Sequence, residues 1–572
     1  INRHSDTPDA LATGVQEVAA LIALLQGTNA DLRISAAQRL GIFRHRNASP
    51  ALAQCLRDKQ REVRVAAAVA LAACGDRDAI QPLLGTLQDA DPLVAQAAAN
   101  ALENLTAHTQ PFNPFGVKAQ QNRQAEAWRE WHQRNAWERV EKDLVTRLSG
   151  DDRDDIRKAA VALGHVGGDA GRRGLREYVL RERQRNPFPE WRKNHRGDEA
   201  RFNSLADVNP RTLQAAVRSL GWLGDVESVG MLSETLRQNV DPEKANLFLA
   251  EAAAEALGRI RTPEAIAALI QAFAGLPNYP EYTRWYGDHD ALIACHSSPV
   301  HYFIIEALDA IGATNTESVV PDLIRSVPTD PDRALLPGND DYETLVGRVI
   351  RRSGREMTVT ETCLALLGDP QATKQPGIEK AIASTHEAWG GKPDPENRAA
   401  QVLSLVCRDR SFEPRIRKAL ERYWILPVDI PRVFDTGIPV VTKLPARHWV
   451  CFFLARTLGN LGDARSVETL VKVLEDSAPE AASGRPDPLG PGVLFLHNDL
   501  TPCWRAEVAW TLGRLGDSRA QPVLLKTVAN LQNATDTRYA AAIAAGQLAN
   551  AAGLTELRRL AQDYPEISVR RA

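Results

Sequence analysis

The sequence lacks the motifs that identify most common enzymes. Its 572 residues contain no G-x-S-x-G, no Walker phosphate loop, no dinucleotide-binding glycine fingerprint and no H-E-x-x-H. Each motif would supply a nucleophile, a phosphate cradle or a metal site, so their absence argues against an enzyme of those classes. No cofactor is expected on the same ground.

Cysteines are few and scattered, and long apolar runs are missing. The seven cysteines form no C-x-x-C pair, which excludes a disulfide framework of the secreted type. No stretch reaches the roughly 18 uninterrupted apolar residues that a membrane helix needs, so no membrane insertion is expected. The cytoplasm is the favoured compartment, with export left open because the chain starts at Ile1 rather than at a methionine.

Aromatic residues and net charge are also low. Aromatics make up 6% of the chain and the formal net charge is -3, so a nucleic-acid partner is not expected. Apolar residues reach 44%, and the core must therefore be built mainly from Ala, Leu and Val. Such small side chains suit closely stacked helices.

An internal repeat is the main positive feature of the sequence. Leu40, Leu71 and Leu102 lie 31 residues apart and close near-copies of one apolar pattern. Further along, Leu-Gly-x-Leu-Gly-Asp recurs three times, ending at Asp225, Asp463 and Asp517. Periods of 20 to 50 residues are typical of solenoids and related arrays.

Each unit is predicted to be a helix, a tight turn and a second helix, because apolar residues return every three or four positions. The second glycine of the motif, as at Gly462 and Gly516, can adopt the left-handed conformation that ends the first helix. The aspartate that follows can cap the second helix. The first glycine, as at Gly221, lies inside the first helix, which predicts close backbone packing there.

These units resemble HEAT repeats, in particular the short bacterial type also found in phycobilisome (bilin) lyases. The resemblance implies an all-α fold, an α-solenoid of about a dozen helix-turn-helix repeats with long inter-repeat loops. The first helices of the repeats are predicted to start near Asp31, Arg61, Asp91, Arg153, Asn209, Ala245, Pro299, Glu356, Glu396, Ala446, Cys503 and Asp536.

The spacing of the repeats divides the chain into five segments. Residues 1–110 are N-terminal repeats, 146–325 are repeats with inserted loops, and 446–572 are C-terminal repeats. Between them, 111–145 is a tryptophan-rich insertion and 326–445 holds degenerate helical repeats and a proline-rich loop. The insertion contains Trp128, Trp131 and Trp137 on roughly one face, which favours packing against the solenoid over partner binding.

Five long insertions lie between repeats, at 183–209, 275–298, 326–354, 425–445 and 477–502. The stretches 186–202, 276–296, 426–445 and 484–502 within them are together rich in proline, aromatics and histidine. These junctions fall on one edge of a solenoid, where long loops usually carry function. Local packing of the aromatics is an equally good reading. The candidate binding residues are Phe188, Trp191, Arg192, Tyr282, Trp285, Tyr286, Phe434, Phe495 and His497.

Two chemical signals in these insertions suggest ligands. His289, His296 and His301 lie near acidic residues and could bind a metal ion, although their spacing matches no known ligand pattern. The basic run 172–201 carries an excess of arginine and could bind an anionic group, although mixtures of Arg and Glu are ordinary on helix surfaces.

These observations predict a non-enzymatic scaffold that binds a protein or another macromolecule through its solenoid surface and inserted loops. The resemblance to lyase repeats offers one alternative, a bilin-lyase-like enzyme or a chromophore chaperone. A metal or carbohydrate site on the loops, with Trp191, Trp285 and His289, is the other alternative. The identity of the partner does not follow from the sequence.

Overall fold

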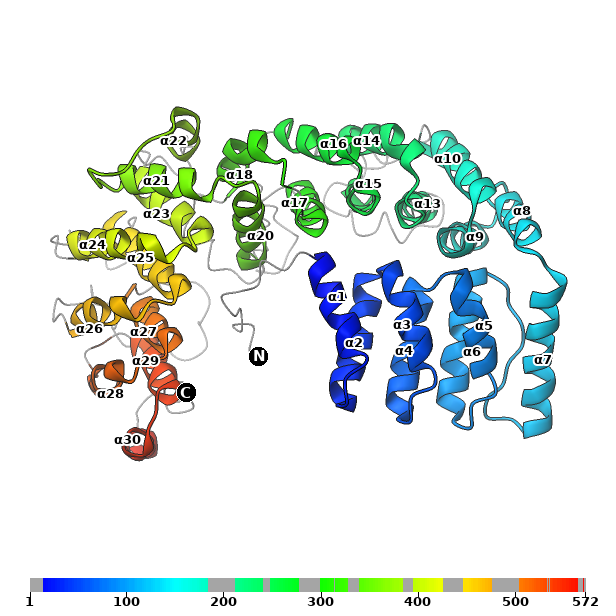
Figure 1. The fold of residues 1–572 in the computed structure, drawn as a ribbon, viewed down its shortest axis with the longest axis horizontal. Coiled ribbons are helices and arrows are strands. Elements are labelled where there is room, and N and C mark those ends of the chain that lie inside the picture. The colour runs from blue at the N-terminus through cyan, green and yellow to red at the C-terminus, as the bar shows by residue number, and fades with distance from the viewer. Residues whose placement is uncertain are drawn as a thin grey trace, which may run out of the picture. The chain divides into compact units, whose positions relative to one another are not determined.

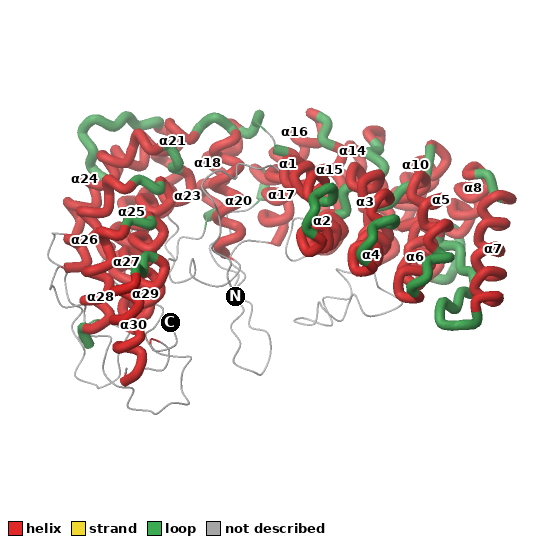
Figure 2. The backbone as a smooth tube through the Cα atoms, turned by 60° about the horizontal axis from the view of Figure 1, so that its bottom comes forward, coloured by secondary structure: helices red, strands yellow, loops and turns green. Residues whose placement is uncertain are grey.

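The computed structural model describes residues 14–183, 211–239, 247–276, 299–312, 314–327, 339–383, 395–424, 446–475, 504–531, 533, 535–563 and 569. Within these ranges the chain consists of helices joined by turns and loops, without a β-strand (Figure 2). The predicted all-α solenoid is confirmed. None of the described helices combines the length and the hydropathy that a membrane crossing requires.

Two compact units make up the chain. The N-terminal unit comprises Leu11–Pro277 and Arg284–Ala313, and the C-terminal unit contains Thr314–Ala572. The helices of the N-terminal unit are α1 (Gly14–Leu24), α2 (Ala30–Phe43), α3 (Ser49–Cys55), α4 (Arg61–Cys74), α5 (Arg77–Thr86), α6 (Pro92–Thr106), α7 (Lys118–Arg134), α8 (Trp137–Arg147), α9 (Arg153–Val166), α10 (Asp169–Arg183), α13 (Arg211–Trp222), α14 (Val229–Gln238), α15 (Leu247–Ile260), α16 (Pro263–Ala274) and α17 (Pro299–Ile311).

The first helices of successive repeats, called A helices here, stack on one another in the N-terminal unit. Helices α2, α4 and α6 form one row, and α9, α13, α15 and α17 form a second row. Leu40, Leu71 and Leu102 are all fully buried, as expected for the repeating core position. Trp128 is also fully buried, and Trp131 and Trp137 pack against the same core, so this stripe is a packing stripe. The helix breaks before Trp137, which begins α8.

The two rows of the N-terminal unit lie against each other, with α1 to α6 below α9 to α17 in Figure 1. Arginine side chains join the ends of their helices. The Arg46 guanidinium donates to the carbonyl oxygens of His165 at 2.8 Å and Trp222 at 3.3 Å, which end α9 and α13. Arg77 donates from Nε to the Val166 oxygen at 2.6 Å. Guanidinium groups at helix C-termini satisfy carbonyls that have no partner within the helix.

The same junction is reinforced from the second row. Arg259, near the end of α15, donates to the carbonyl oxygens of Arg44 at 2.9 Å and Phe43 at 3.2 Å, where α2 ends. The buried ring of His165 makes a hydrogen bond from Nδ1 to the Gly75 oxygen at 2.9 Å. Each row therefore caps helix ends of the other row.

In the C-terminal unit the A helices α21, α23, α25, α27 and α29 pack in sequence order. Over the whole chain, all twelve predicted A helices begin within two residues of the predicted position. The helices of this unit are α18 (Val320–Ser326), α20 (Asn339–Arg352), α21 (Glu356–Leu366), α22 (Pro376–Ala383), α23 (Pro395–Val406), α24 (Glu413–Trp424), α25 (Ala446–Leu461), α26 (Val467–Glu475), α27 (Trp504–Leu515), α28 (Gln521–Ala529), α29 (Thr535–Gln547) and α30 (Ala551–Asp563).

The expectation of a loop over the whole of 326–354 was wrong. Residues 339–352 form α20, which packs against α18 and α23. Tyr342, Val346 and Val349 are buried on the packed face, and their spacing of three and four residues is helical. The described part of this insertion therefore belongs to the scaffold.

The glycines of the repeated motif act as the sequence predicts. Gly224, Gly462 and Gly516 have φ between 61° and 71°, in the left-handed region that favours glycine. At Gly221, inside α13, an added Cβ would lie 2.5 Å from the Cα of Ala256 in α15. That glycine therefore permits the close approach of two A helices.

Candidate functional site

The turns of the last repeats carry paired aspartate and arginine side chains. After Gly462, the Asp463 carboxylate accepts the backbone N–H of Arg465 at 3.0 Å, and the Arg465 guanidinium bends back onto it, with Nη2 to Oδ2 at 2.6 Å. Asp517 and Arg519 repeat this geometry one unit later, at 2.9 and 2.6 Å. The predicted aspartate caps are confirmed at both of these turns. At the third copy of the motif the prediction was wrong, because the Asp225 side chain makes no capping hydrogen bond and pairs with Arg176 instead.

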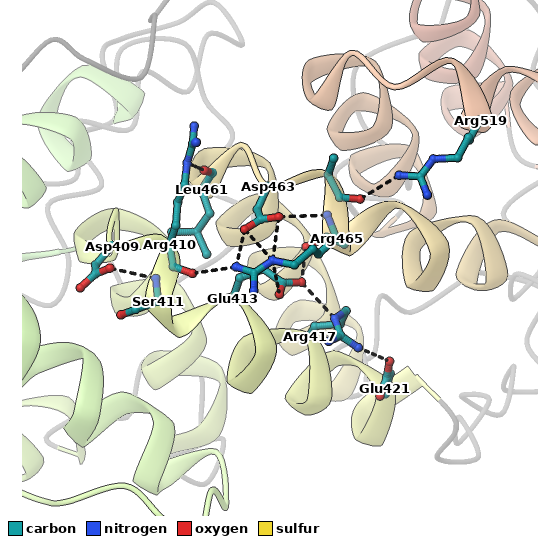
Figure 3. Close-up of polar contacts among 12 residues, drawn as sticks. Asp409, Arg410, Ser411, Glu413, Arg417, Glu421, Leu461, Asp463, Arg465 and Arg519 are labelled. Atoms are coloured by element: carbon teal, nitrogen blue, oxygen red, sulfur yellow. Dashed lines mark hydrogen bonds and ion pairs between the residues drawn. The ribbon is translucent and has the colours of Figure 1, made fainter.

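Neighbouring turns are linked through these arginines (Figure 3). Arg465 donates to the carbonyl oxygen of Arg410 in the preceding turn at 3.5 Å, and Arg519 donates to that of Ala464 at 3.3 Å. Arg410 itself donates from Nε to the Leu461 oxygen at 2.8 Å. The turns therefore form a ladder from repeat to repeat.

A buried carboxylate at the start of α24 bonds to residues of this ladder. Glu413 is fully buried, accepts the Ser466 hydroxyl at 2.7 Å and pairs with Arg417 at 3.0 Å (Figure 3). The hydrogen bond from Arg465 also lowers the pKa of Asp463 below its usual range. Because each exposed arginine already faces its own aspartate, the turn ladder is a stiffening edge with little free charge for a ligand.

A second surface, which carries arginines and partly exposed aromatic rings, lies on α25, α27 and α29. We call it the A-helix face and define it by Arg456, Trp510, Arg514 and Tyr539. Trp510 is half-buried and Tyr539 is 37% exposed, with their ring centroids 6.4 Å apart. The face therefore presents two aromatic rings from adjacent repeats side by side.

Ion pairs hold the arginines of the A-helix face in place. The nearly buried Glu507 accepts Arg514 Nη2 at 2.6 Å and lies 3.6 Å from Arg456 Nε. The Arg514 group also contacts the Thr511 hydroxyl at 3.0 Å, and the Arg456 guanidinium lies 4.6 Å from the centre of the Phe452 ring. Among the described residues of this face two guanidiniums share one carboxylate, which leaves a local positive charge.

Most residues predicted as a binding or metal site lie outside the described parts of the chain. These are Phe188, Trp191, Arg192, Tyr282, Trp285, Tyr286, Phe434, Phe495, His497, His289 and His296. Only His301 is described: it lies in the first turn of α17, is buried, and its ring meets that of Phe273 edge-on at 5.2 Å. Burial lowers the pKa of His301 to about 4. Within the described residues no three His, Cys, Asp or Glu side chains gather as a metal site would require.

The first half of the basic run is committed to structural contacts. Arg176 pairs with Asp225 at 2.8 Å and with Glu227 at 2.8 Å, and Arg172 donates to the Leu223 oxygen at 3.1 Å. These bonds connect α10 to the turn after α13. This part of the run therefore needs no anionic ligand to explain it.

Sequence reasoning did not single out the A-helix face. The feature of the sequence that could have indicated this face is the spacing of Trp510 and Arg514, which lie four residues apart within an otherwise buried helix. Residues at that separation share one side of a helix. Trp510 and Arg514 are among the few residues of α27 that are not fully buried, and this pair could have been noted.

Comparison with known families identifies the repeats. A model of HEAT repeats matches residues 18–103 and 199–279. The model of the PBS lyase HEAT-like repeat matches residues 450–476 and 504–530. The second pair of matches covers most of α25 to α28, including Arg456, Trp510 and Arg514 of the A-helix face, whereas Tyr539 lies beyond it in α29. No curated protein sequence matches the chain.

Similar solved structures are distant. Human deoxyhypusine hydroxylase in complex with glycerol is 17% identical over 76% of this chain and 93% of its own, with a TM-score of 0.19. Kap121p bound to Pho4p is 9% identical over 97% of this chain and 53% of its own, with a TM-score of 0.39. The CpcE–CpcF phycocyanin lyase complex of a Nostoc species is 20% identical over 53% and 92%, with a TM-score of 0.21. These scores are too low to carry an argument about function.

Proposed function

Because the chain is a HEAT-repeat protein, we propose that it is a non-enzymatic scaffold that binds a protein partner, with the A-helix face as a contact surface. Stacked repeats provide extended and rigid surfaces of this kind.

The observation that carries this proposal is the chemistry of the A-helix face. Trp, Tyr and Arg are the residue types that dominate the binding energy of protein interfaces. Here Trp510 and Tyr539 are partly exposed and adjacent, while Glu507 holds Arg456 and Arg514. Side chains that are already fixed lose less conformational entropy on binding than free ones.

Charge suggests the character of the partner surface. Arg456 and Arg514 share the single carboxylate of Glu507, so a complementary surface would carry acidic groups and apolar side chains. The sequence predicts that the aromatic insertions between repeats are recognition loops. We propose these insertions as a second contact surface for the same partner. Their role is tested separately by shortening residues 276–298 and 484–502.

The test uses the intact chain as bait for affinity capture from cells of its source, followed by titration calorimetry with the purified partner. We expect the double variant Trp510→Ala, Arg514→Ala to weaken binding by at least about tenfold, the usual effect of losing an interface anchor. Leu554→Ala on α30 is the control, because this side chain is exposed but lies outside the face. Equal affinity of the double variant and the control, or no specific partner, would refute the proposal.

A bilin-lyase-like activity or chromophore chaperone is the second candidate, supported by the matches to the PBS lyase HEAT-like repeat over 450–476 and 504–530. Mixing the purified chain with a free bilin tests it. A shift in the bilin absorbance that saturates with protein concentration is required, and an unchanged spectrum ends this candidate.

A further inference from the structure

A group of basic side chains lies where the two rows of the N-terminal unit meet. We call it the basic cluster and define it by Arg44, His45, Arg259 and Arg261. The hydrogen bonds from Arg259 to the carbonyl oxygens of Phe43 and Arg44 hold the end of α2 against the end of α15. The cluster thus joins two segments more than 200 residues apart in sequence.

Two of these arginines occupy backbone positions that normally favour glycine. Arg44 has φ 51° and Arg261 has φ 60°, and each donates its backbone N–H to the fourth residue before it, in the turn that ends its helix. Other left-handed positions in the described chain hold glycine, such as Gly224 and Gly462, and Ala107 is the one further exception. Strained residues that persist at such positions often serve a function. Both arginine side chains therefore need an explanation beyond helix termination.

The positive charge of the basic cluster is not balanced within the described residues. The Glu255 carboxylate, which pairs with Arg259 of the cluster, also accepts Arg218 Nε at 2.8 Å, while its bond to Arg259 Nε is 3.1 Å long. The guanidinium groups of Arg44 and Arg261 pair with no carboxylate in the described part of the chain. Two unpaired guanidiniums leave an excess charge that a dianion would neutralise.

His45 adds a neutral donor to this group. Its Nδ1 accepts the backbone N–H of Asn47 at 3.3 Å, so the proton of the neutral ring sits on Nε2. Burial, followed by the charges of Arg261 and Arg259, lowers the pKa of His45, which keeps the ring neutral at pH 7. The Nε2–H is therefore available to donate to an anion without adding charge.

We propose that the basic cluster binds a phosphate-type dianion, either free or as a phosphorylated side chain of a protein. Arginine forks and a neutral imidazole N–H suit the oxygen atoms of such a group. The proposal stands apart from the A-helix face, which belongs to the C-terminal unit. Its failure would leave the proposed scaffold function untouched.

The left-handed backbone allows an unusually clean test with the intact chain. Arg261→Gly removes a guanidinium and places glycine where φ favours it, so the melting temperature should not fall. We expect calorimetric titration with O-phosphoserine to show affinity reduced about 10- to 100-fold, the range for one charge-assisted hydrogen-bonding group. Arg44→Gly is a second variant of the same kind, because Arg44 also has a positive φ that favours glycine.

Ala107→Gly is the matched control, because it relieves the remaining left-handed non-glycine position without removing charge. Its affinity should equal that of the parent chain. A parallel titration with inorganic phosphate separates the two sources: tighter binding of O-phosphoserine indicates a phosphorylated side chain, and tighter binding of phosphate indicates the free ion. Absence of saturable binding in the parent chain, or unchanged binding in both arginine variants, would overturn the proposal.

Discussion

Acid is expected to destabilise the N-terminal unit through two buried histidines. His165 and His301 are almost fully buried, and burial lowers the pKa of each to about 4. His165 donates to the Gly75 oxygen, and the nearby charge of Arg46 further opposes its protonation. In the unfolded chain both rings would titrate near 6.5.

The sign and size of the effect follow from these values. Because the folded pKa lies below the unfolded pKa, the unfolded chain binds more protons between pH 6.5 and pH 4. The stability is fully present above the unfolded pKa and is lost as the pH falls towards the folded pKa. At pH 5 each histidine should lower the free energy of unfolding by about 2 kcal/mol, and the pair by about 4 kcal/mol.

Urea denaturation at pH 7 and pH 5, combined with hydrogen exchange read by mass spectrometry, measures this loss in each unit separately. The double variant His165→Asn, His301→Leu removes both titrating groups, and the asparagine amide can still donate to the Gly75 oxygen. We expect the variant to be less stable at pH 7 but to lose little further stability at pH 5. An acid loss as large as that of the parent chain would refute the assignment to these histidines.

Three further predictions concern packing, a buried charge and a cap, each measured by urea denaturation. Gly221→Ala should destabilise by about 2 kcal/mol or more, because its Cβ would meet Ala256, whereas Gly230→Ala, with open space around it, should stabilise by about 0.5–1 kcal/mol. Arg398→Ala should cost about 3–5 kcal/mol, because it leaves buried carbonyl oxygens at the end of α18 without their donor. Asp463→Ala should cost about 1 kcal/mol through loss of its cap.

The repeat scaffold could be predicted because its signals are local. The helical spacing of apolar residues and the glycine and aspartate of each turn fix the A helices to within two residues. Helix α20 was missed because prolines and acidic residues around 328–341 resemble a loop. The periodic Tyr342, Val346 and Val349 were present in the sequence but were outweighed by that composition.

The junction of the N-terminal unit could not be predicted in the same way. Arg46 and Arg259 donate to backbone carbonyls, which every residue carries, so their acceptors leave no trace in the sequence. The A-helix face could be predicted only in part. The spacing of Trp510 and Arg514 was readable, but their closeness to Tyr539 depends on how one repeat packs on the next.

The hydrogen bonds from Arg259 to the end of α2 restrict how the number of repeats in this protein can change. In an open array each repeat touches only its neighbours, so units can be duplicated or deleted with little effect elsewhere. Here, adding or deleting a unit between α4 and α15 would move Arg259 away from the carbonyls it caps. The N-terminal unit therefore has a fixed number of repeats, and changes in length are best tolerated in the segments between them.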